Sequence, residues 1–270
     1  MGSAGAGAVR KTTRIVGAYL TASFKLAVQY RVEFFVGSAM TLFWVAWSLA
    51  PALVAWSQRS EIAGWTFHEA LLVIAWFMLL RALLEGAVQP SLIAVIEHIR
   101  KGTLDFVLLK PVDAQLLVSV ARAEPRRAFD VVIALGVAAY AFFRLGRAPD
   151  PLGVVIALVL TLTSALLLYS LAILVVSAAF WVVRLDNLLY LFNAIFDAAR
   201  WPASVFRGVL AVLFTFVIPL ALMTTYPALA LLGRLSVEVA LLAVLGSLLF
   251  SAMARAVWKR ALSRYTSASS

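Results

Sequence analysis

Cysteine is absent from the 270 residues, so the chain has neither disulfides nor thiolate-bound metals. His68 and His98 are the only two histidines, which argues against a histidine-rich metal site. Charged residues are also scarce, at 13% against roughly 25% in an average soluble domain. The remaining composition is 64% hydrophobic, more than an aqueous globule of this size can bury. A soluble enzyme, a disulfide scaffold and a disordered chain are therefore excluded, and a polytopic membrane protein remains.

Motifs for nucleotide hydrolysis and acyl transfer are missing as well. The nearest approach to a P-loop is Lys101-Gly102-Thr103, which has the wrong order and no preceding glycine. Neither H-E-x-x-H nor G-x-S-x-G occurs. We therefore predict that the chain is not an enzyme and binds no metal or cofactor of its own.

Six apolar stretches are candidates for membrane-spanning helices, each of which needs about 20 mostly apolar residues to cross the hydrocarbon layer. The fourth is the longest, and its central part contains no Gly, Pro, Asn or Asp, so we expect one long, tilted helix rather than two. The predicted fold is all-α, a single transmembrane domain over residues 1–270. The stretches are 34–56, 70–96, 128–143, 152–183, 204–225 and 237–257.

The formal net charge of +10 is distributed unevenly around these stretches. If both termini are cytoplasmic, most of the 23 Lys and Arg residues fall in cytoplasmic segments. The expected external loops, 57–69, 145–151 and 226–236, hold only Arg59, Arg147 and Arg234, and Arg144 lies directly before the second of them. This asymmetry follows the positive-inside rule and predicts six spans with both ends in the cytoplasm. Because the membrane accounts for the basic excess, no nucleic-acid partner is expected.

Residues 15–33 precede the first stretch and form an expected amphipathic helix. Thr21, Lys25 and Gln29 recur at intervals of four residues and share one helical face. A basic helix with one apolar face lies along a membrane surface rather than across it. The alternative is a plain cytoplasmic extension of the first span.

The cytoplasmic region 97–127 contains the most informative segment. Arg100 and Lys101 suit the carbonyl end of a helix, and Gly102 suits a left-handed helix stop. A short apolar turn, 103–109, follows and is closed by Lys110-Pro111. Apolar side chains on the water side of a membrane need a partner, either lipid or a protein groove, and we favour a separate soluble subunit. The apolar side chains of this turn are Leu104, Phe106, Val107 and Leu108.

The last internal segment, 185–202, reads as an amphipathic helix with a narrow polar stripe. Along this stripe Asp197 and Arg200 are spaced to pair. The helix is expected to lie in the membrane interface or to line a vestibule; both readings remain open. The stripe consists of Asp186, Tyr190, Asn193, Asp197 and Arg200.

Arg81 and Glu85 fall near the middle of the second stretch, four residues apart and thus on one helical face. An isolated Arg at the bilayer centre costs at least ~2.5 kcal/mol, which pairing with Glu85 reduces. The pair is either a polar point on a translocation route or a buried ion pair that fixes helix packing, and we favour the second. Pro90 and Pro219 are expected to kink the second and fifth stretches.

Three segments together resemble the permease subunits of ABC-2 type transporters, and specifically the bacterial ABC-2 family of uncharacterised ABC-type permeases. The most specific is IRKGTLDFVLLKPVD at 99–113. The others are FDAARWP at 196–202 and the stretch from Ile218-Pro219 through Tyr226-Pro227. The resemblance covers nearly the whole chain.

The resemblance implies a pair of permeases, identical or similar, with two cytoplasmic ATPase subunits that bind ATP and Mg beneath them. It places a coupling helix after the second span and makes 15–33 a connecting helix. It also implies short re-entrant helices after the fifth span, for which 226–236 is brief. The expected ATPase-coupling residues are Arg100, Lys101, Gly102, Thr103, Leu104, Asp105, Phe106, Leu108, Lys110 and Pro111.

The predicted function is therefore the transmembrane part of an ATP-driven exporter in the bacterial inner membrane. Family members export lipids, polysaccharides, peptides or drugs, and the sequence does not identify the cargo. Two alternatives remain. An ion-coupled secondary transporter would need several intramembrane carboxylates, whereas the sequence offers one, in an Arg–Glu pair. A non-transporting membrane scaffold is the other.

Overall fold

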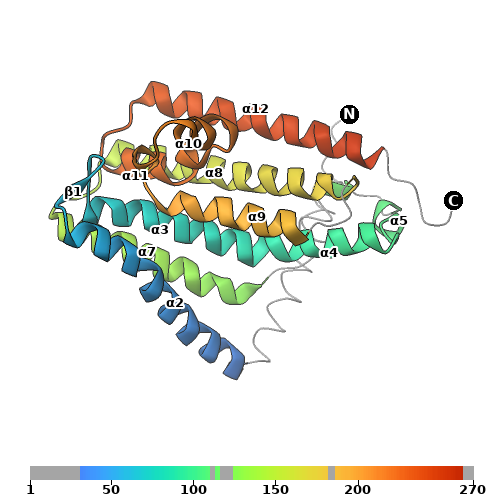
Figure 1. Cartoon of the computed structure of the whole chain (residues 1–270), viewed down its shortest axis with the longest axis horizontal. Helices are drawn as coiled ribbons and strands as arrows, with labels where there is room; N and C mark the ends of the chain where they lie inside the picture. The colour runs from blue at the N-terminus through green and yellow to red at the C-terminus, as the bar shows by residue number, and fades with distance from the viewer. Residues whose placement is uncertain (1–30, 110–112, 116–123, 182–185, 264–270) are drawn as a thin grey trace, which may run out of the picture.

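The computed structural model describes residues 31–109, 113–115, 124–181 and 186–263, and Figure 1 shows them as a bundle of long helices. The described part is almost entirely helical, which confirms the predicted all-α class. Within the described residues, five helices are long and apolar enough to cross a membrane. They are α2 (Arg31–Ser57), α3 continuing through η1 into α4 (Phe67–Arg100), α7 (Ala128–Leu145), α8 (Pro151–Ala178) and α12 (Val237–Leu262).

The bundle has two distinct ends. One carries a two-stranded hairpin of β1 (Glu61–Ile62) and β2 (Trp65–Thr66), whose turn includes Gly64 at a φ of 85°. We call this the hairpin end. The opposite end, the α5 end, carries the short helix α5 (Asp105–Leu108) beyond α4 (Figure 1).

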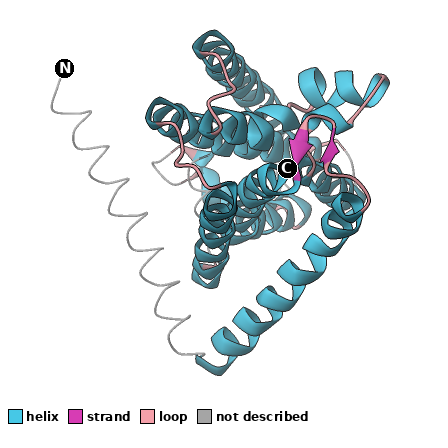
Figure 2. Ribbon diagram, turned by 90° about the vertical axis from the view of Figure 1, so that its left-hand side faces the viewer, coloured by secondary structure: helices cyan, strands magenta, loops and turns pink. Residues whose placement is uncertain are grey.

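The second apolar stretch provides the centre of the bundle. Within Phe67–Arg100, 61% of the most apolar window is buried, against 11% for the window in α2. Fully buried side chains such as Leu72, Leu80 and Leu84 lie along this helix. Figures 1 and 2 show that α2 instead diverges from the other helices toward its N-terminal end. The exposed apolar face of α2 therefore has lipid or another subunit as its natural neighbour.

A π-helix interrupts the central helix without breaking it. α3 (Phe67–Leu83) passes into η1 (Leu84–Val88) and then into α4 (Gln89–Arg100). Pro90 is the second residue of α4 and has no backbone N–H, and the carbonyl of Gly86, four residues earlier, accepts from the backbone N–H of Glu124 instead. The expected irregularity at Pro90 is thus a π-turn rather than a sharp kink.

The expected fifth span, 204–225, is not a continuous helix, and the crossing to the hairpin end occurs earlier. α9 (Asp186–Asp197) and η3 (Ala198–Arg200) carry the chain back along α8 from the α5 end (Figure 1). Ser204 then reaches the hairpin, where its hydroxyl donates to the carbonyl of Ala63 at 3.0 Å and accepts from the indole of Trp65 at 3.1 Å. The described part of the segment 185–202, which was expected to lie in the membrane interface or to line a vestibule, is therefore part of the bundle.

Residues 203–231 form a series of short helices that dips into the bundle from the hairpin end. Leu222 accepts a hydrogen bond from Ser164 in the middle of α8, and the buried Thr224 hydroxyl donates to Ala199. The elements are η4 (Ala203–Val205), α10 (Val209–Val212), η5 (Leu213–Val217), η6 (Ala221–Thr225) and α11 (Tyr226–Leu231). The resemblance implied short re-entrant helices at 226–236, whereas the series of short helices runs from Ala203 to Leu231 and begins well before that loop.

Proline explains where this series turns. Ile218 precedes Pro219 and has extended backbone angles, φ −122° and ψ 88°, because proline disfavours a helical conformation at the preceding residue. The helical path therefore stops at Val217 and restarts at Ala221. A straight span was predicted from hydropathy alone, which does not register this break.

Two other expected boundaries need comment. α8 ends at Ala178, earlier than the expected 183, although it remains one uninterrupted helix as predicted. Most of the expected surface helix 15–33 lies outside the described residues, as do Lys110 and Pro111 of the coupling segment.

Candidate functional site

A network of charged side chains joins the central helix to α9. Arg81 pairs with Glu85 through Nε and Oε1 at 2.8 Å, as the spacing predicted. The Nη1 atom of the same Arg81 donates to Oδ1 of Asp197 at 2.5 Å. Asp197 also pairs with Arg200 at 3.3 Å, the other pair that spacing predicted. The two pairs, 116 residues apart in sequence, therefore form one cluster.

The network continues from Glu85 to the start of α7. Glu85 Oε2 lies 2.6 Å from Nη2 of Arg127, whose Nη1 donates to Asp130 at 2.9 Å. Burial disfavours the charged form of Arg127, but its hydrogen bond to Asp130 and the charges of Glu85, Asp130 and Glu124 outweigh that cost. The pKa of Arg127 is consequently raised above its ordinary value, and the guanidinium stays protonated at any physiological pH.

Gly86 allows the chain before α7 to approach the π-helix closely. The backbone N–H of Glu124 donates to the carbonyl of Gly86 at 2.7 Å. A Cβ atom added at Gly86 would lie 2.9 Å from Cβ of Arg127, closer than real Cβ contacts. The π-turn and the glycine together thus place Arg127 beside Glu85.

The position of the network along the bundle differs from the predicted one. α7 spans 18 residues or ~27 Å, close to the ~30 Å of a hydrocarbon layer. Since Arg127 immediately precedes α7 and contacts Glu85, Glu85 lies at the level of the first turn of α7 rather than in mid-span. Arg81 is one turn further into the bundle, and its side chain is 41% exposed. An exposed Arg at this depth requires water or another protein chain as its neighbour, because lipid contact would be costly.

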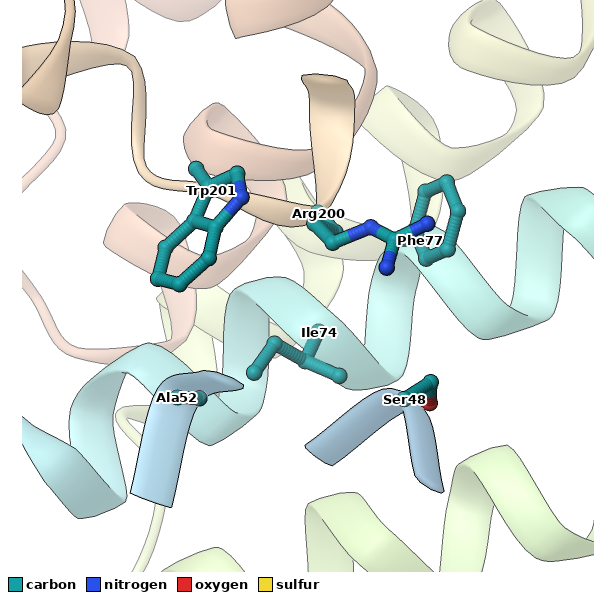
Figure 3. Close-up of a pocket in the computed structure, with 6 residues that line it drawn as sticks. All are labelled: Ser48, Ala52, Ile74, Phe77, Arg200 and Trp201. Carbon is teal, nitrogen blue, oxygen red and sulfur yellow. The ribbon is translucent and has the colours of Figure 1, made fainter. Parts of the chain in front are cut away.

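A small pocket adjoins the network between α2 and α3. Arg200 and Phe77 form one side, with the guanidinium 5.4 Å from the ring centroid, and Trp201 closes the end (Figure 3). Ser48 and Ala52 of α2 form the opposite side (Figure 3). Ile74 completes the lining of this small, open pocket. It combines apolar walls with one cationic group.

The predicted coupling segment adopts the predicted turn. Gly102 has a φ of 64°, the left-handed conformation that ends α4. Leu104, directly before α5, has a fully buried side chain. Phe106 within α5 is 70% exposed, and Leu109 directly after it is 80% exposed. The expectation that all the apolar residues face a partner therefore needs correction. Leu104 anchors the turn to the bundle, and Phe106 and Leu109 point away from it.

Polar contacts stiffen this turn. The ring nitrogen Nδ1 of His98 and the hydroxyl of Thr103 lie 2.8 Å apart, and the Thr103 backbone N–H donates to the His98 carbonyl at 2.9 Å. Lys101 lies 3.8 Å from Glu97. The α4–α5 junction is therefore held by bonds on both sides of Gly102.

The chain downstream of the coupling segment is tied to α8 and α12. Arg255 in α12 pairs with Asp113 at 2.8 Å and donates to the side-chain oxygen of Gln115 at 3.0 Å. Gln115 in turn donates to the hydroxyl of Tyr169 in α8 at 3.1 Å. The α8–α12 pair is further joined by a Ser170–Ser251 hydrogen bond of 2.9 Å. A displacement of residues 113–115 would thus act directly on two membrane-length helices.

At the hairpin end one buried carboxylate joins the three loops that were expected to be external. Glu69 is 5% exposed and closes a capping box with Thr66 at the start of α3. Its Oε1 atom accepts from Arg234 at 2.6 Å and from Arg147 at 3.4 Å. All three loops therefore lie at one end, opposite α5, as the alternation of spans requires.

Sequence reasoning found the pairs but not their connection. Arg127 falls at the end of the expected region 97–127 and Asp130 in the expected stretch 128–143, and no spacing rule links either to Glu85 some forty residues away. Their only signal was charge at the edge of an apolar stretch. Asn193 is half-buried in α9, and the side chain of Asp186 lies outside the described residues. Within the described residues no group of three or more His, Cys, Asp or Glu is arranged to hold a metal ion.

Comparison with known proteins now supplies the family. A family model described as ABC-2 family transporter protein matches residues 42–269, most of the chain. In the comparisons with curated proteins and with solved structures, nothing matches. Together with the membrane-length helices, the match makes the chain a multi-pass membrane protein and a permease component, and the resemblance drawn from the motifs is confirmed. The chain belongs to the ABC-2 family of transporter proteins.

Proposed function

We propose that the chain is the transmembrane permease subunit of an ATP-binding cassette exporter in the bacterial inner membrane. ATP and Mg are bound by separate cytoplasmic ATPase subunits that dock on α5. The observation that carries this proposal is the exposure of Phe106 and Leu109 on a short, well-anchored helix beyond the membrane-length part of the bundle. Two large apolar side chains in water favour insertion into a protein groove.

In this proposal the α5 end is cytoplasmic and the hairpin end external. The chain crosses the membrane six times, with α9 and η3 serving as the fifth crossing and residues 203–231 re-entering from outside. Support comes from the three expected external loops, which meet at Glu69, and from the basic residues that flank α5.

A second permease subunit, identical or similar, completes the translocation path. The half-exposed charges of Arg81 and Asp197 favour this arrangement, because a facing subunit and a polar cavity between the two would shield them from lipid. The exposed apolar face of α2 is available for the same association or for lipid.

Transport would begin with closure of the ATPase subunits on ATP. α5 would move as a rigid lever because Leu104 is buried in the bundle and the His98–Thr103 contact stiffens its junction with α4. The motion would reach α8 and α12 through Asp113, Gln115 and Arg255. Inward and outward access would then alternate at the subunit interface.

Co-purification tests the docking role. The affinity-tagged chain is expected to retain a P-loop ATPase, identified by mass spectrometry and by ATP hydrolysis in the eluate. Phe106→Asp and Asp105→Arg should each lower the retained ATPase at least fivefold, while the yield of membrane-inserted chain stays unchanged. The matched control is Leu245→Asn, another exposed apolar residue but on α12. Equal ATPase retention by all four proteins would contradict docking on α5.

An ion-coupled secondary transporter remains the second candidate, and one observation favours it. The charged network contains Glu85, Asp130 and Asp197 rather than the single acid that the sequence suggested. Each of these acids is paired with an Arg, however, which suits a fixed charge cluster better than a proton relay. Transport by the chain alone in vesicles, driven by a pH gradient without ATP, would establish this alternative.

A further inference from the structure

The central helix changes its packing partner at η1. Before the π-turn, α3 packs chiefly along α7, which buries Ala134 and Ala141. After the π-turn, α4 packs chiefly on α8. The central helix therefore consists of two halves that belong to different parts of the bundle, and the halves meet at residues 84–88.

The backbone hydrogen bonds of the helix are weakest at the same place. The N–H of Gln89 donates to the carbonyl of Leu84, five residues earlier, which makes this turn wider than an α-helical one. In a regular helix the next N–H would bond the carbonyl of Gly86, but Pro90 has none, and Gly86 accepts from Glu124 instead. Bending at this turn consequently breaks fewer helical hydrogen bonds than bending elsewhere in the span.

One carboxylate restrains the turn. Glu85 lies within η1, and its two oxygens bind guanidinium groups on either side, Arg81 in α3 at 2.8 Å and Arg127 before α7 at 2.6 Å. The Glu85 side chain is 20% exposed, so both contacts are better shielded from water than surface ion pairs. Because α7 packs along α3, Glu85 holds the π-turn against the α3–α7 pair.

The far end of α4 leads to α5 (Figure 1). α4 has 12 residues and is therefore ~18 Å long. A rotation of about 10° at the π-turn would displace its far end by about 3 Å, from the same rise per residue. A small change in η1 is thus coupled to a displacement of the short helix that carries Phe106.

We propose that η1 is a hinge about which α4 and α5 tilt relative to α3 and α7, and that the Glu85 carboxylate restrains this tilt. The inference rests on the proposed function only where it assigns the tilt to a displacement of α5 by an ATPase. The hinge itself follows from the wider turn, the missing N–H of Pro90 and the change of packing partner.

Hydrogen exchange in the full chain tests the hinge without any substitution. The chain in neutral detergent is transferred to deuterated water, and its peptides are followed by mass spectrometry. Amides in 84–92 should exchange at least tenfold faster than those in 160–168 of the uninterrupted helix α8, a segment with nearly the same pattern of buried and half-buried residues. Equal rates in the two segments would overturn the proposal.

Two variants test the restraint. Glu85→Gln should raise exchange in 84–92 at least threefold and leave 160–168 unchanged. The matched control is Glu124→Gln, which removes a carboxylate 3.7 Å from Arg126 and 3.9 Å from Arg127 and should exchange like the unmodified chain. An equal rise in the two variants, or an equal rise in the two segments, would overturn the restraint by Glu85.

Deletion of Ala87 tests the π-turn as the source of the motion. A π-turn accommodates one residue more than an α-helical turn, so the deletion restores a regular turn while α4 keeps its face toward α8. Exchange in 84–92 should then fall to the rate of 160–168, even when combined with Glu85→Gln. Fast exchange that survives the deletion would overturn the hinge.

The tilt is measured between two spin labels on the cysteine-free chain. Glu97→Cys on α4 and Val132→Cys on α7 are both exposed. The distribution of distances between the labels should be broader with Glu85→Gln than with Glu124→Gln, and deletion of Ala87 should reverse the broadening. A distribution that is the same in all these variants would overturn the tilt.

Neither measurement contains an ATPase, so the two proposals fail separately. Loss of ATPase association with fast exchange in 84–92 would refute docking on α5 alone. Uniform exchange with intact ATPase association would refute the hinge alone.

Discussion

At the scale of single residues, Gly153 shows how closely the backbone segments of the bundle approach each other. A Cβ atom at this position would lie 2.0 Å from the carbonyl oxygen of Ala230, a backbone atom that cannot rotate away. We expect Gly153→Ala to destabilise the chain by about 1–3 kcal/mol or more, because α8 and α11 must separate. The measurement is the melting temperature in detergent. Gly136→Ala is the matched control, since nothing lies within 4 Å of its added Cβ, and an equal melting temperature for the two variants would refute the close approach.

The charged network makes a second prediction at this scale. Glu85→Gln removes the carboxylate shared by Arg81 and Arg127, so two guanidinium groups lose a partner at once. We expect a clearly lower melting temperature than for Glu97→Gln, whose exposed carboxylate pairs only with Lys101 at 3.8 Å. Titration of Arg127 should not make this difference in melting temperature depend on pH, because the pKa of Arg127 is raised further above the physiological range. Indistinguishable melting temperatures would mean that the network contributes nothing to stability.

What the sequence reveals of the site depends on the range of each interaction. Arg81–Glu85 and Asp197–Arg200 were predictable because both partners lie within one helical turn. The contact of Arg81 with Asp197 was not, because it depends on how α9 packs against α3. The exposure pattern of α5 also escaped prediction, since Leu104 and Phe106 are equally apolar and differ only in which one meets the bundle.

At the scale of elements, Arg255 links the coupling segment to α12 and is expected to transmit its motion. Arg255→Asp should preserve ATPase co-purification, which depends on Phe106, but lower substrate-stimulated ATP hydrolysis at least fivefold. The Asp113→Arg, Arg255→Asp double variant restores an ion pair of reversed polarity. Recovery of stimulated hydrolysis in the double variant identifies the pair as the linkage. If the double variant is as impaired as the single one, the residues act separately.

Continuous elements were predicted well and discontinuous ones poorly. α2, α7 and α12 begin and end within a few residues of the expected stretches, because each is a single apolar run bounded by polar residues. The stretch 204–225 is equally apolar but contains Pro219, and its hydropathy does not distinguish a span from a series of short helices that re-enter the bundle. The helix 185–202 was expected in the membrane interface or along a vestibule, whereas Asp197 of its polar stripe contacts both Arg81 and Arg200 inside the bundle.

At the scale of the whole molecule, the direction in which the bundle is inserted decides where an ATPase can dock. The absence of cysteine makes each introduced thiol the only one in the chain. Phe106→Cys and Ser60→Cys are both at exposed positions, one at the α5 end and one at the hairpin end, so they form a matched pair. In intact cells whose outer membrane has been made permeable, a membrane-impermeant maleimide should label the thiol at 60 and not that at 106. After the inner membrane is opened, both should react, because each side chain is largely free of the bundle. Labelling at 106 in intact cells would place α5 outside the cytoplasm, where no ATP is available. The exposed apolar side chains of α5 would then have no ATPase groove to enter.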